Sequence, residues 1–233
     1  DILRLVGNPS IATPDPAAAQ AMGAAVPTKV GTSAVTPLGK LLWAAPLLQA
    51  TVVVPTAQAA PLAAASATTH QLNPSQQAAV AHALERALSI IWGPPGTGKT
   101  KTLSAYVHTL VTHATSENKG LKVLLTGPTY KAVEELVSRV IKLLDADATC
   151  KSEVYVCYSA GRQHMAIATN GTHLKAAAVE IQDQQFTNDC LPSMGNPAKI
   201  TIVATSVMQA HKFGNLLHGA LLAPVFDVVI IDE

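Results

Sequence analysis

Residues 93–100 read Gly-Pro-Pro-Gly-Thr-Gly-Lys-Thr, and this stretch decides the fold. It matches the pattern G-x-x-x-x-G-K-[ST] at every fixed position. A short apolar run, residues 88–92, precedes it, and apolar residues at helical spacing follow it. We therefore predict a strand, a glycine-rich loop and a helix beginning at Lys99, which together form a phosphate-binding loop.

Each residue type in this loop suits a nucleoside triphosphate. Gly96 and Gly98 let backbone N–H groups face phosphate oxygens, and the following helix adds partial positive charge. Lys99 would reach the β- and γ-phosphates, and the Thr100 hydroxyl would coordinate Mg²⁺. The alternative is a chance glycine-rich turn, which the match and its context disfavour. The residues expected to contact the nucleotide here are Gly93, Pro94, Pro95, Gly96, Thr97, Gly98, Lys99, Thr100 and Lys101.

A second acidic segment completes the expected site. Residues 226–233 read FDVVIIDE, a β-branched run followed by two carboxylates. Ligands bind at the carboxyl ends of strands in open α/β sheets, which is where Asp232 and Glu233 would lie. We expect Asp232 to hold Mg²⁺ with Thr100, and Glu233 to polarise the attacking water as general base. Alone, these acids would indicate an ordinary solvated turn. The predicted catalytic residues are Lys99, Asp232 and Glu233.

Short apolar strands alternate with amphipathic helices from residue 71 onward. This order predicts an α/β fold with a mostly parallel sheet buried on both faces. Asn73 is the expected N-cap of the first helix, with Pro74 at its first position. The predicted strands are 88–92, 122–126, 153–158, 200–204 and 226–231. The predicted helices are 74–86, 99–113, one after residue 130 and one near 174–185. The helix after residue 130 is expected to place its apolar residues on one face: Val133, Leu136, Val137, Val140, Ile141 and Leu144.

The first seventy residues differ from the rest in composition. They hold 18 Ala and 8 Pro but five charged residues. We predict an irregular accessory segment or linker over 1–70, with a short strand near 51–54 and regular structure beginning at Leu72. Residues 41–62 are apolar, but Pro46, Pro55 and Pro61 interrupt them, so we predict no membrane segment.

Charge and cysteine content give weaker indications. Residues 71–233 hold 13 Lys and Arg against 13 Asp and Glu, so no overall basic field indicates nucleic acid and any such contact must be local. The three cysteines contain no C-x-x-C pair, and their spacing does not predict zinc. So few cysteines suit a reducing compartment, the cytoplasm or, in a eukaryote, the nucleus.

Four segments together resemble superfamily 1 helicases, in the branch that contains the nonsense-mediated-decay RNA helicase. They are Leu72-Asn73-x-Ser75-Gln76, GPPGTGKT, TGPTYKAVEEL at 126–136, and FDVVIIDE. The resemblance covers 71–233 and implies the first of two RecA-like motor domains of an ATP-dependent helicase or translocase. Its implied cofactors are ATP and Mg²⁺, and its implied partner is a single strand of DNA or RNA. A second RecA-like domain with its arginine finger would lie outside this chain, so we expect this piece to hydrolyse ATP poorly.

The resemblance also implies roles for residues outside the loop. Gln76 would read the adenine edge, although a helix-capping role is the alternative. Residues Pro128, Thr129, Tyr130 and Lys131 would contact the sugar–phosphate backbone, the alternative being a capped helix start with a solvated lysine. Thr205, in a turn expected at 204–206, would make a further backbone contact.

Two other functions remain open on the sequence. The loop sequence GPPGTGKT is shared with AAA+ ATPases, which remodel proteins and form rings. The long interval between Lys99 and Asp232, with several predicted strands and helices in it, favours the helicase interpretation. A nucleotide-binding module that does not hydrolyse ATP is the third alternative.

Overall fold

The computed structural model describes residues 29–30, 33–34, 54–86, 88–158, 173–178, 184–210 and 226–232. Within these residues, a five-stranded parallel sheet in the order β5-β4-β6-β3-β7 forms the centre. The predicted α/β fold of a P-loop NTPase is confirmed. The strands are β3 (Leu121–Gly127), β4 (Glu153–Cys157), β5 (Leu174–Ala178), β6 (Ile200–Ser206) and β7 (Val228–Ile231).

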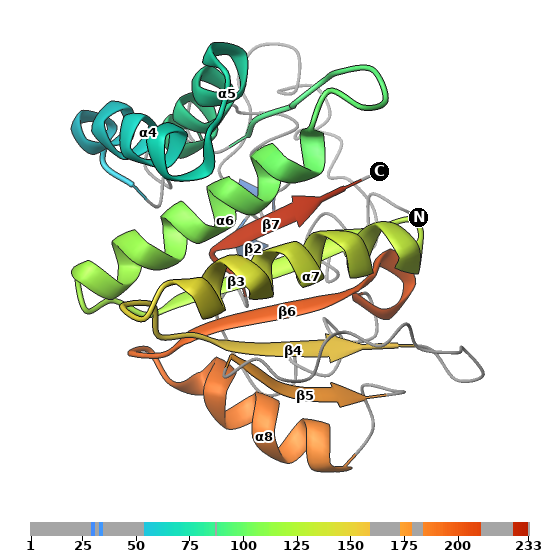
Figure 1. The fold of residues 1–233 in the computed structure, drawn as a ribbon. Helices are drawn as coiled ribbons and strands as arrows, with labels where there is room; N and C mark the ends of the chain where they lie inside the picture. The colour runs from blue at the N-terminus through green and yellow to red at the C-terminus, as the bar shows by residue number, and fades with distance from the viewer. Residues whose placement is uncertain are drawn as a thin grey trace.

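Helices cover both faces of this sheet (Figure 1). On one face lie α6 (Lys99–Ser116) and α7 (Tyr130–Ala146), and α8 (Gln184–Gly195) packs on β4, β5 and β6 from the other. Beyond α6, α4 (Thr56–His70) and α5 (Pro74–Glu85) pack against each other and against α6. A separate antiparallel pair joins β1 (Lys29–Val30) to β2 (Ser33–Ala34).

The two layers follow from alternation along the strands, because successive side chains of a strand point to opposite faces. In β3, Val123 and Leu125 join the cluster beneath α6 and α7, whereas Leu124 joins the cluster beneath α8. The apolar stripe expected on α7 is confirmed, and burial of each such side chain contributes about 1.5–3 kcal/mol. Its buried members are Val133, Leu136, Val137, Val140, Ile141 and Leu144.

The register between β3 and β7 decides where the acidic segment ends. Thr126 pairs with Ile231, and the backbone N–H of Asp232 donates to the Thr126 carbonyl at 2.9 Å. A Cβ atom on Gly127 would lie 2.4 Å from the Asp232 carbonyl oxygen, so only glycine permits this approach. The parallel ladder therefore fixes Asp232 at the carboxyl edge of the sheet.

The strand predicted at residues 88–92 is wrong, since this segment has no assigned strand pairing and β7 ends the described sheet. The segment keeps a two-residue alternation: Leu88, Ile90 and Trp92 are exposed, and Ser89 and Ile91 are half-buried. A strand gains stability when both of its faces are covered or when a ladder is completed. Here the described residues cover only one face.

Regular structure begins earlier than the sequence predicts. Helix α4 occupies residues 56–70, where we expected irregular chain, and it includes Pro61. Alanine has the highest helix propensity, and Ala59, Ala63 and Ser66 form a buried stripe on α4. No helix in the described part of the chain combines the length and apolarity needed to cross a bilayer. The division of the chain at residue 70 stays a prediction, although α4 shares a core cluster with the rest.

The helix predicted near residues 174–185 is also wrong in its first part. Residues 174–178 form β5, which pairs in parallel with β4, and α8 begins at Gln184. The sequence Leu-Lys-Ala-Ala-Ala favours a helix by propensity. Tertiary pairing overrides that preference at the edge of the sheet.

A buried ammonium group attaches the end of α8 to the sheet. Lys122 Nζ donates to the carbonyls of Ser193 at 2.9 Å, Asn196 at 2.8 Å and Lys199 at 2.7 Å. Burial lowers the pKa of Lys122, while the negative charges of Asp227 and Glu153 oppose that shift. The lysine acts as a fixed donor to carbonyls that would otherwise lose water without replacement.

We expect Lys122→Met to lower the free energy of unfolding by about 2–3 kcal/mol, because it leaves buried carbonyls without donors. Urea unfolding followed by circular dichroism measures this change. The control is Lys119→Met, because Lys119 is exposed and pairs with Glu117 at the surface. Equal effects of the two substitutions would show that the buried ammonium does not hold α8.

Candidate functional site

The loop before α6 has the backbone that its glycines predict. Gly96 has φ +82° and Gly98 has φ +84°, the left-handed region that side chains disfavour. Gly98 is also the N-cap of α6. A Cβ atom there would lie 2.7 Å from Gln76 Nε2, whereas a Cβ atom on Gly96 would meet nothing within 4 Å. The two glycines are therefore required for different reasons.

Lys99 crosses the loop from the first turn of α6. Its Nζ donates to the Gly93 carbonyl at 2.7 Å and to the Pro94 carbonyl at 3.4 Å. The Thr97 hydroxyl also donates to the Pro94 carbonyl, at 2.8 Å. These bonds hold the ammonium beside the loop that begins at Gly93.

The acidic segment reaches the loop at one point. Thr100 Oγ1 donates to Asp232 Oδ2 at 3.2 Å, between residues 132 positions apart in sequence. Asp232 is buried, with an exposed fraction of 5%. Two oxygens bound to one Mg²⁺ at about 2.1 Å and a right angle lie about 3 Å apart, so this pair of oxygen donors fits that ion. Thr100 and Asp232 are thus the residues that could hold Mg²⁺.

A cavity of about 570 Å³ opens from the same place. It extends between residues 88–92, α6 and β7, and both Lys99 and Asp232 line it. Trp92 lies at its wall with an exposed fraction of 87%. Glu233, the expected general base, lies outside the described residues.

Gln76 caps a helix and also contacts the loop. Its side-chain Oε1 accepts from Asn73 N at 3.1 Å, and its Nε2 donates to the Thr97 carbonyl at 3.0 Å. Together with the bond from Gln76 N to Asn73 Oδ1, this completes a capping box. An amide has a second lone pair and a second N–H, which would match an adenine edge. The adenine role stays a prediction.

The residues expected to contact a nucleic acid divide into two groups. Thr129 caps α7 by accepting from Ala132 N at 3.3 Å, and Tyr130 packs its ring against Tyr158. Pro128, Thr129 and Lys131 are exposed. They follow Gly127, which touches Asp232, so this group lies at the same sheet edge as the loop.

The second group is Thr205 alone, whose side chain is buried in the sheet. The turn expected at 204–206 is the end of β6, and Thr205 is fully buried there. Its hydroxyl donates to the Cys157 carbonyl at 3.0 Å, so this structure gives no support to a contact between Thr205 and a nucleic-acid strand. Lys101 is expected at the nucleotide and not at a nucleic acid; its Nζ donates to the Gln71 carbonyl at 2.8 Å and so connects α6 to the segment between α4 and α5.

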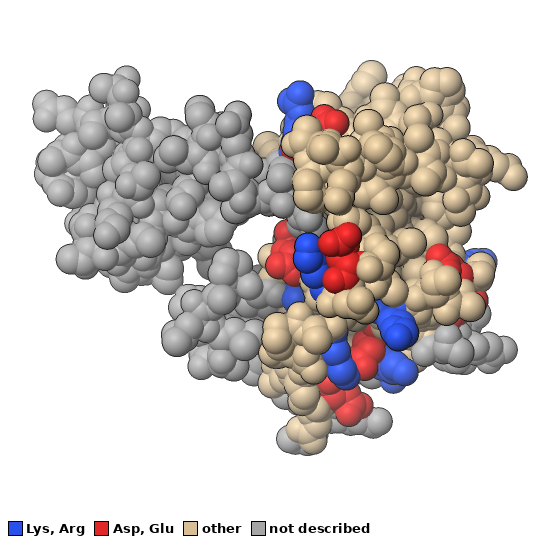
Figure 2. All heavy atoms as spheres, turned by 90° about the vertical axis from the view of Figure 1, so that its left-hand side faces the viewer, with Lys and Arg blue, Asp and Glu red and all other residues tan. Residues whose placement is uncertain are grey.

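The opposite edge of the sheet carries mixed charge. Figure 2 shows Lys and Arg beside Asp and Glu on the face that lies to the left in Figure 1, where the strands begin. Lys199 pairs there with Glu153 at 2.7 Å, and Lys119 pairs with Glu117 at 3.4 Å. Mixed charge of this kind does not attract a polyanion.

Sequence reasoning missed one further group of side chains. His108, Asp147 and Cys150 come together beneath α6, and their ligand atoms all lie within 4.8 Å of one another. His108 and Asp147 are far apart in sequence, and Asp-x-x-Cys is no metal motif by itself. The sequence therefore carried no signal for this cluster.

Comparison with known proteins agrees with the resemblance noted in the sequence. The family model described as "AAA domain" matches residues 71–195. A Drosophila melanogaster protein, "Regulator of nonsense transcripts 1 homolog", is 46% identical over 69 residues, which are 30% of this chain and 5% of that protein. The "ATP-dependent helicase NAM7" of Saccharomyces cerevisiae is 44% identical over 70 residues, 30% of this chain and 7% of that protein.

A third relative is the rat "DNA-binding protein SMUBP-2", 40% identical over 84 residues, 36% of this chain and 7% of that protein. The chain thus spans less than a tenth of the length of each of these relatives. No solved structure matches the chain significantly. The predicted similarity to superfamily 1 helicases of the nonsense-mediated-decay branch is confirmed by these relatives.

The two left-handed glycines provide a test of the loop geometry. We expect Gly96→Ala to lower the free energy of unfolding by about 1–2 kcal/mol, the cost of a left-handed backbone with a side chain. Gly98→Ala should lower it further, because its methyl group also displaces the Gln76 amide. Urea unfolding of both variants measures the difference. Equal losses would contradict the contact between Gln76 and the loop.

Proposed function

The chain belongs to the AAA domain family, and we propose that it binds Mg²⁺–ATP and hydrolyses it as the first motor domain of an ATP-dependent nucleic-acid helicase or translocase. The observation that carries this proposal is the contact between Thr100 and Asp232 at 3.2 Å. It joins the hydroxyl at the start of α6 to an acid at the carboxyl end of β7. A hydroxyl and a carboxylate beside a phosphate loop are the donors of a triphosphate-bound Mg²⁺.

In this proposal the loop residues bind the phosphates. Backbone N–H groups of residues 96–99 and the N-terminus of α6 would face the phosphate oxygens. The Lys99 ammonium would exchange the Gly93 carbonyl for the β- and γ-phosphates. That exchange costs little, because a carbonyl of the loop is replaced by a charged oxygen.

Mg²⁺, when bound, would neutralise charge on the β- and γ-phosphate oxygens. Thr100 and Asp232 would hold it with their hydroxyl and carboxylate oxygens. Glu233, the next residue, would accept a proton from the attacking water as general base. Because Asp232 is anchored through its own N–H to Thr126, its position would be set before the nucleotide arrives.

A single nucleic-acid strand is the proposed partner, and Pro128, Thr129, Tyr130 and Lys131 would contact it. The printed names of the relatives, an ATP-dependent helicase and a DNA-binding protein among them, support this assignment. The capped N-terminus of α7 offers N–H groups and a lysine to a phosphate, beside the nucleotide loop. A movement at the phosphate loop would be passed to the residues that contact the nucleic acid through Gly127, which lies against Asp232.

The second candidate is an AAA+-type ATPase that remodels proteins, because such ATPases share the loop sequence GPPGTGKT. This candidate predicts nucleotide-dependent rings and an ATPase rate that is indifferent to nucleic acid. The relatives named above favour an ATPase that is stimulated by a nucleic-acid strand instead.

The metal pair has a direct test in this chain. We expect Thr100→Ala and Asp232→Asn each to weaken ATP binding in Mg²⁺ by about tenfold or more, a loss of about 1.4 kcal/mol. The first change removes the coordinating hydroxyl, and the second removes the negative charge of the coordinating carboxylate. In EDTA the same variants should bind like the native chain. Titration calorimetry measures both conditions, and Asp189→Asn, an exposed acid on α8, is the control. Equal losses with and without Mg²⁺ would contradict a metal role.

The proposed nucleic-acid partner is tested with the full-length protein that contains this chain. We expect ATP hydrolysis to rise at least about tenfold with single-stranded DNA or RNA, because strand binding assembles the motor domains. Lys99→Met should abolish the rate, whereas Lys101→Met should keep most of it, because the Lys101 ammonium bonds to Gln71. A phosphate-release assay gives these rates. A rate indifferent to every strand, with rings formed in ATP, would favour the second candidate.

A further inference from the structure

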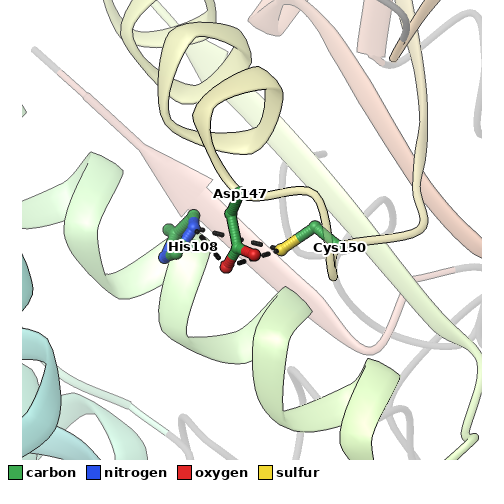
Figure 3. A group of neighbouring side chains, drawn as sticks. All are labelled: His108, Asp147 and Cys150. Carbon is green, nitrogen blue, oxygen red and sulfur yellow. Dashed lines mark hydrogen bonds and ion pairs between the residues drawn. The ribbon is translucent and has the colours of Figure 1, made fainter.

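A cluster of three ligand-type side chains lies between α6 and the end of α7 (Figure 3). His108 projects from α6, Asp147 is the residue that ends α7, and Cys150 follows in the turn before β4. His108 and Cys150 are buried, and Asp147 is half-buried. None of the three has a part in the proposed nucleotide site.

The three distances in the cluster are within a few tenths of an ångström of those in a tetrahedral metal site. His108 Nε2 lies 3.3 Å from Asp147 Oδ2, Cys150 Sγ lies 3.5 Å from the same oxygen, and Sγ lies 3.9 Å from Nε2. Zinc bonds of about 2.0–2.1 Å to N and O and about 2.3 Å to S, at tetrahedral angles, place ligand atoms about 3.3–3.6 Å apart. One ion therefore fits at the centre with movements of a few tenths of an ångström.

The surrounding bonds fix the orientation of the carboxylate. Asp147 Oδ1 accepts from the Thr149 N–H at 2.9 Å and from the Thr149 hydroxyl at 2.6 Å. The other oxygen, Oδ2, is then directed at His108 and Cys150. Thr112 approaches Cys150 Sγ at 3.5 Å, so the thiol too is held in place. A metal site of this kind needs little rearrangement to form.

Charge favours a divalent ion at this depth. A thiolate, a carboxylate and a neutral imidazole around a dication sum to zero, which lowers the cost of burial. Burial raises the pKa of the Cys150 thiol to about 11, so without an ion the sulfur keeps its proton and donates to Asp147. That protonated, buried thiol is a poor nucleophile, which argues against covalent catalysis.

A neighbouring histidine adds a second observation. The His70 ring packs edge-on against His108, with centroids 4.9 Å apart. Its Nε2 is buried and has no hydrogen-bond partner among the described residues. A buried imidazole nitrogen without a partner is unusual, and here its ring contacts His108, one of the three candidate ligands.

We propose that His108, Asp147 and Cys150 bind one Zn²⁺ ion, with the fourth position taken by water. Mixed N, O and S donors in a tetrahedral arrangement select zinc among common divalent ions. On binding, the thiol proton leaves to solvent and the sulfur bonds to the metal. The proton that His108 Nε2 shares with Asp147 is also released, so that the neutral imidazole binds through Nε2 and carries its remaining proton on Nδ1. The ion joins α6, the helix that begins at the phosphate loop, to the turn leading into β4.

Cobalt substitution tests the site in this chain. After the purified chain is stripped with a chelator, one equivalent of Co²⁺ should produce a thiolate-to-cobalt charge-transfer band and strong tetrahedral d–d bands, which Zn²⁺ then abolishes. Cys150→Ser should remove the charge-transfer band, and Cys150→Ser, Asp147→Asn and His108→Ala should each weaken binding at least about tenfold. Cys190→Ser, at a buried cysteine of α8, should leave the spectrum unchanged.

A second measurement guards against variants that simply unfold. Zn²⁺ should raise the thermal midpoint of the native chain and of Cys190→Ser but not that of Cys150→Ser, each checked by circular dichroism. If folded native chain gives no thiolate–cobalt band at one equivalent, or if Cys190→Ser loses it as Cys150→Ser does, the proposal is wrong. His70→Ala changes the d–d bands only if His70, rather than water, occupies the fourth position, which would overturn that part of the assignment.

Discussion

The structure depends on the parallel ladder between β3 and β7. This pairing places β7, which is far from β3 in sequence, beside it in the sheet. It also positions Asp232 at the carboxyl edge, where the Asp232 N–H donates to the Thr126 carbonyl. Parallel strands require crossovers, and here the crossover helices α7 and α8 lie on opposite faces, with α6 on the same face as α7. Without that register the Thr100 hydroxyl would not lie within hydrogen-bonding distance of the Asp232 carboxylate.

Sequence alone was sufficient where local chemistry and tertiary packing agree. The glycine loop needs left-handed backbone at two positions, and glycine stands at both. Asn73, Pro74 and Gln76 specify a helix start by side-chain bonding that is independent of the rest of the fold. On α7, periodicity alone identified the buried face. In each case one short segment contains the information.

Sequence reasoning failed where the decision lies in distant partners. Residues 88–92 are apolar and alternate, but a strand also needs a ladder, which the neighbouring β7 does not supply. Residues 174–178 have helical propensity and become an edge strand because β4 offers a partner. The helix at residues 56–70 was not predicted because Pro55 and Pro61 indicate irregular chain, although Pro61 is tolerated in a helix that buries a stripe of small residues. The cluster around Cys150 exists only once α6 and α7 have packed. The roles of Gln76, Glu233 and the strand-contact residues stay predictions.

The outer edge of β7 has a consequence for handling the protein. Its N–H and C=O groups lie at the end of the described sheet, and Val229 and Ile231 are exposed beside them, with Ile90 and Trp92 exposed nearby. Among the described residues this edge has no strand partner, and an unpaired edge flanked by apolar side chains is a template for adding another strand. Concentrated solutions of this chain should accordingly self-associate through intermolecular β-pairing, and a charged residue in place of Val229 should keep the chain monodisperse.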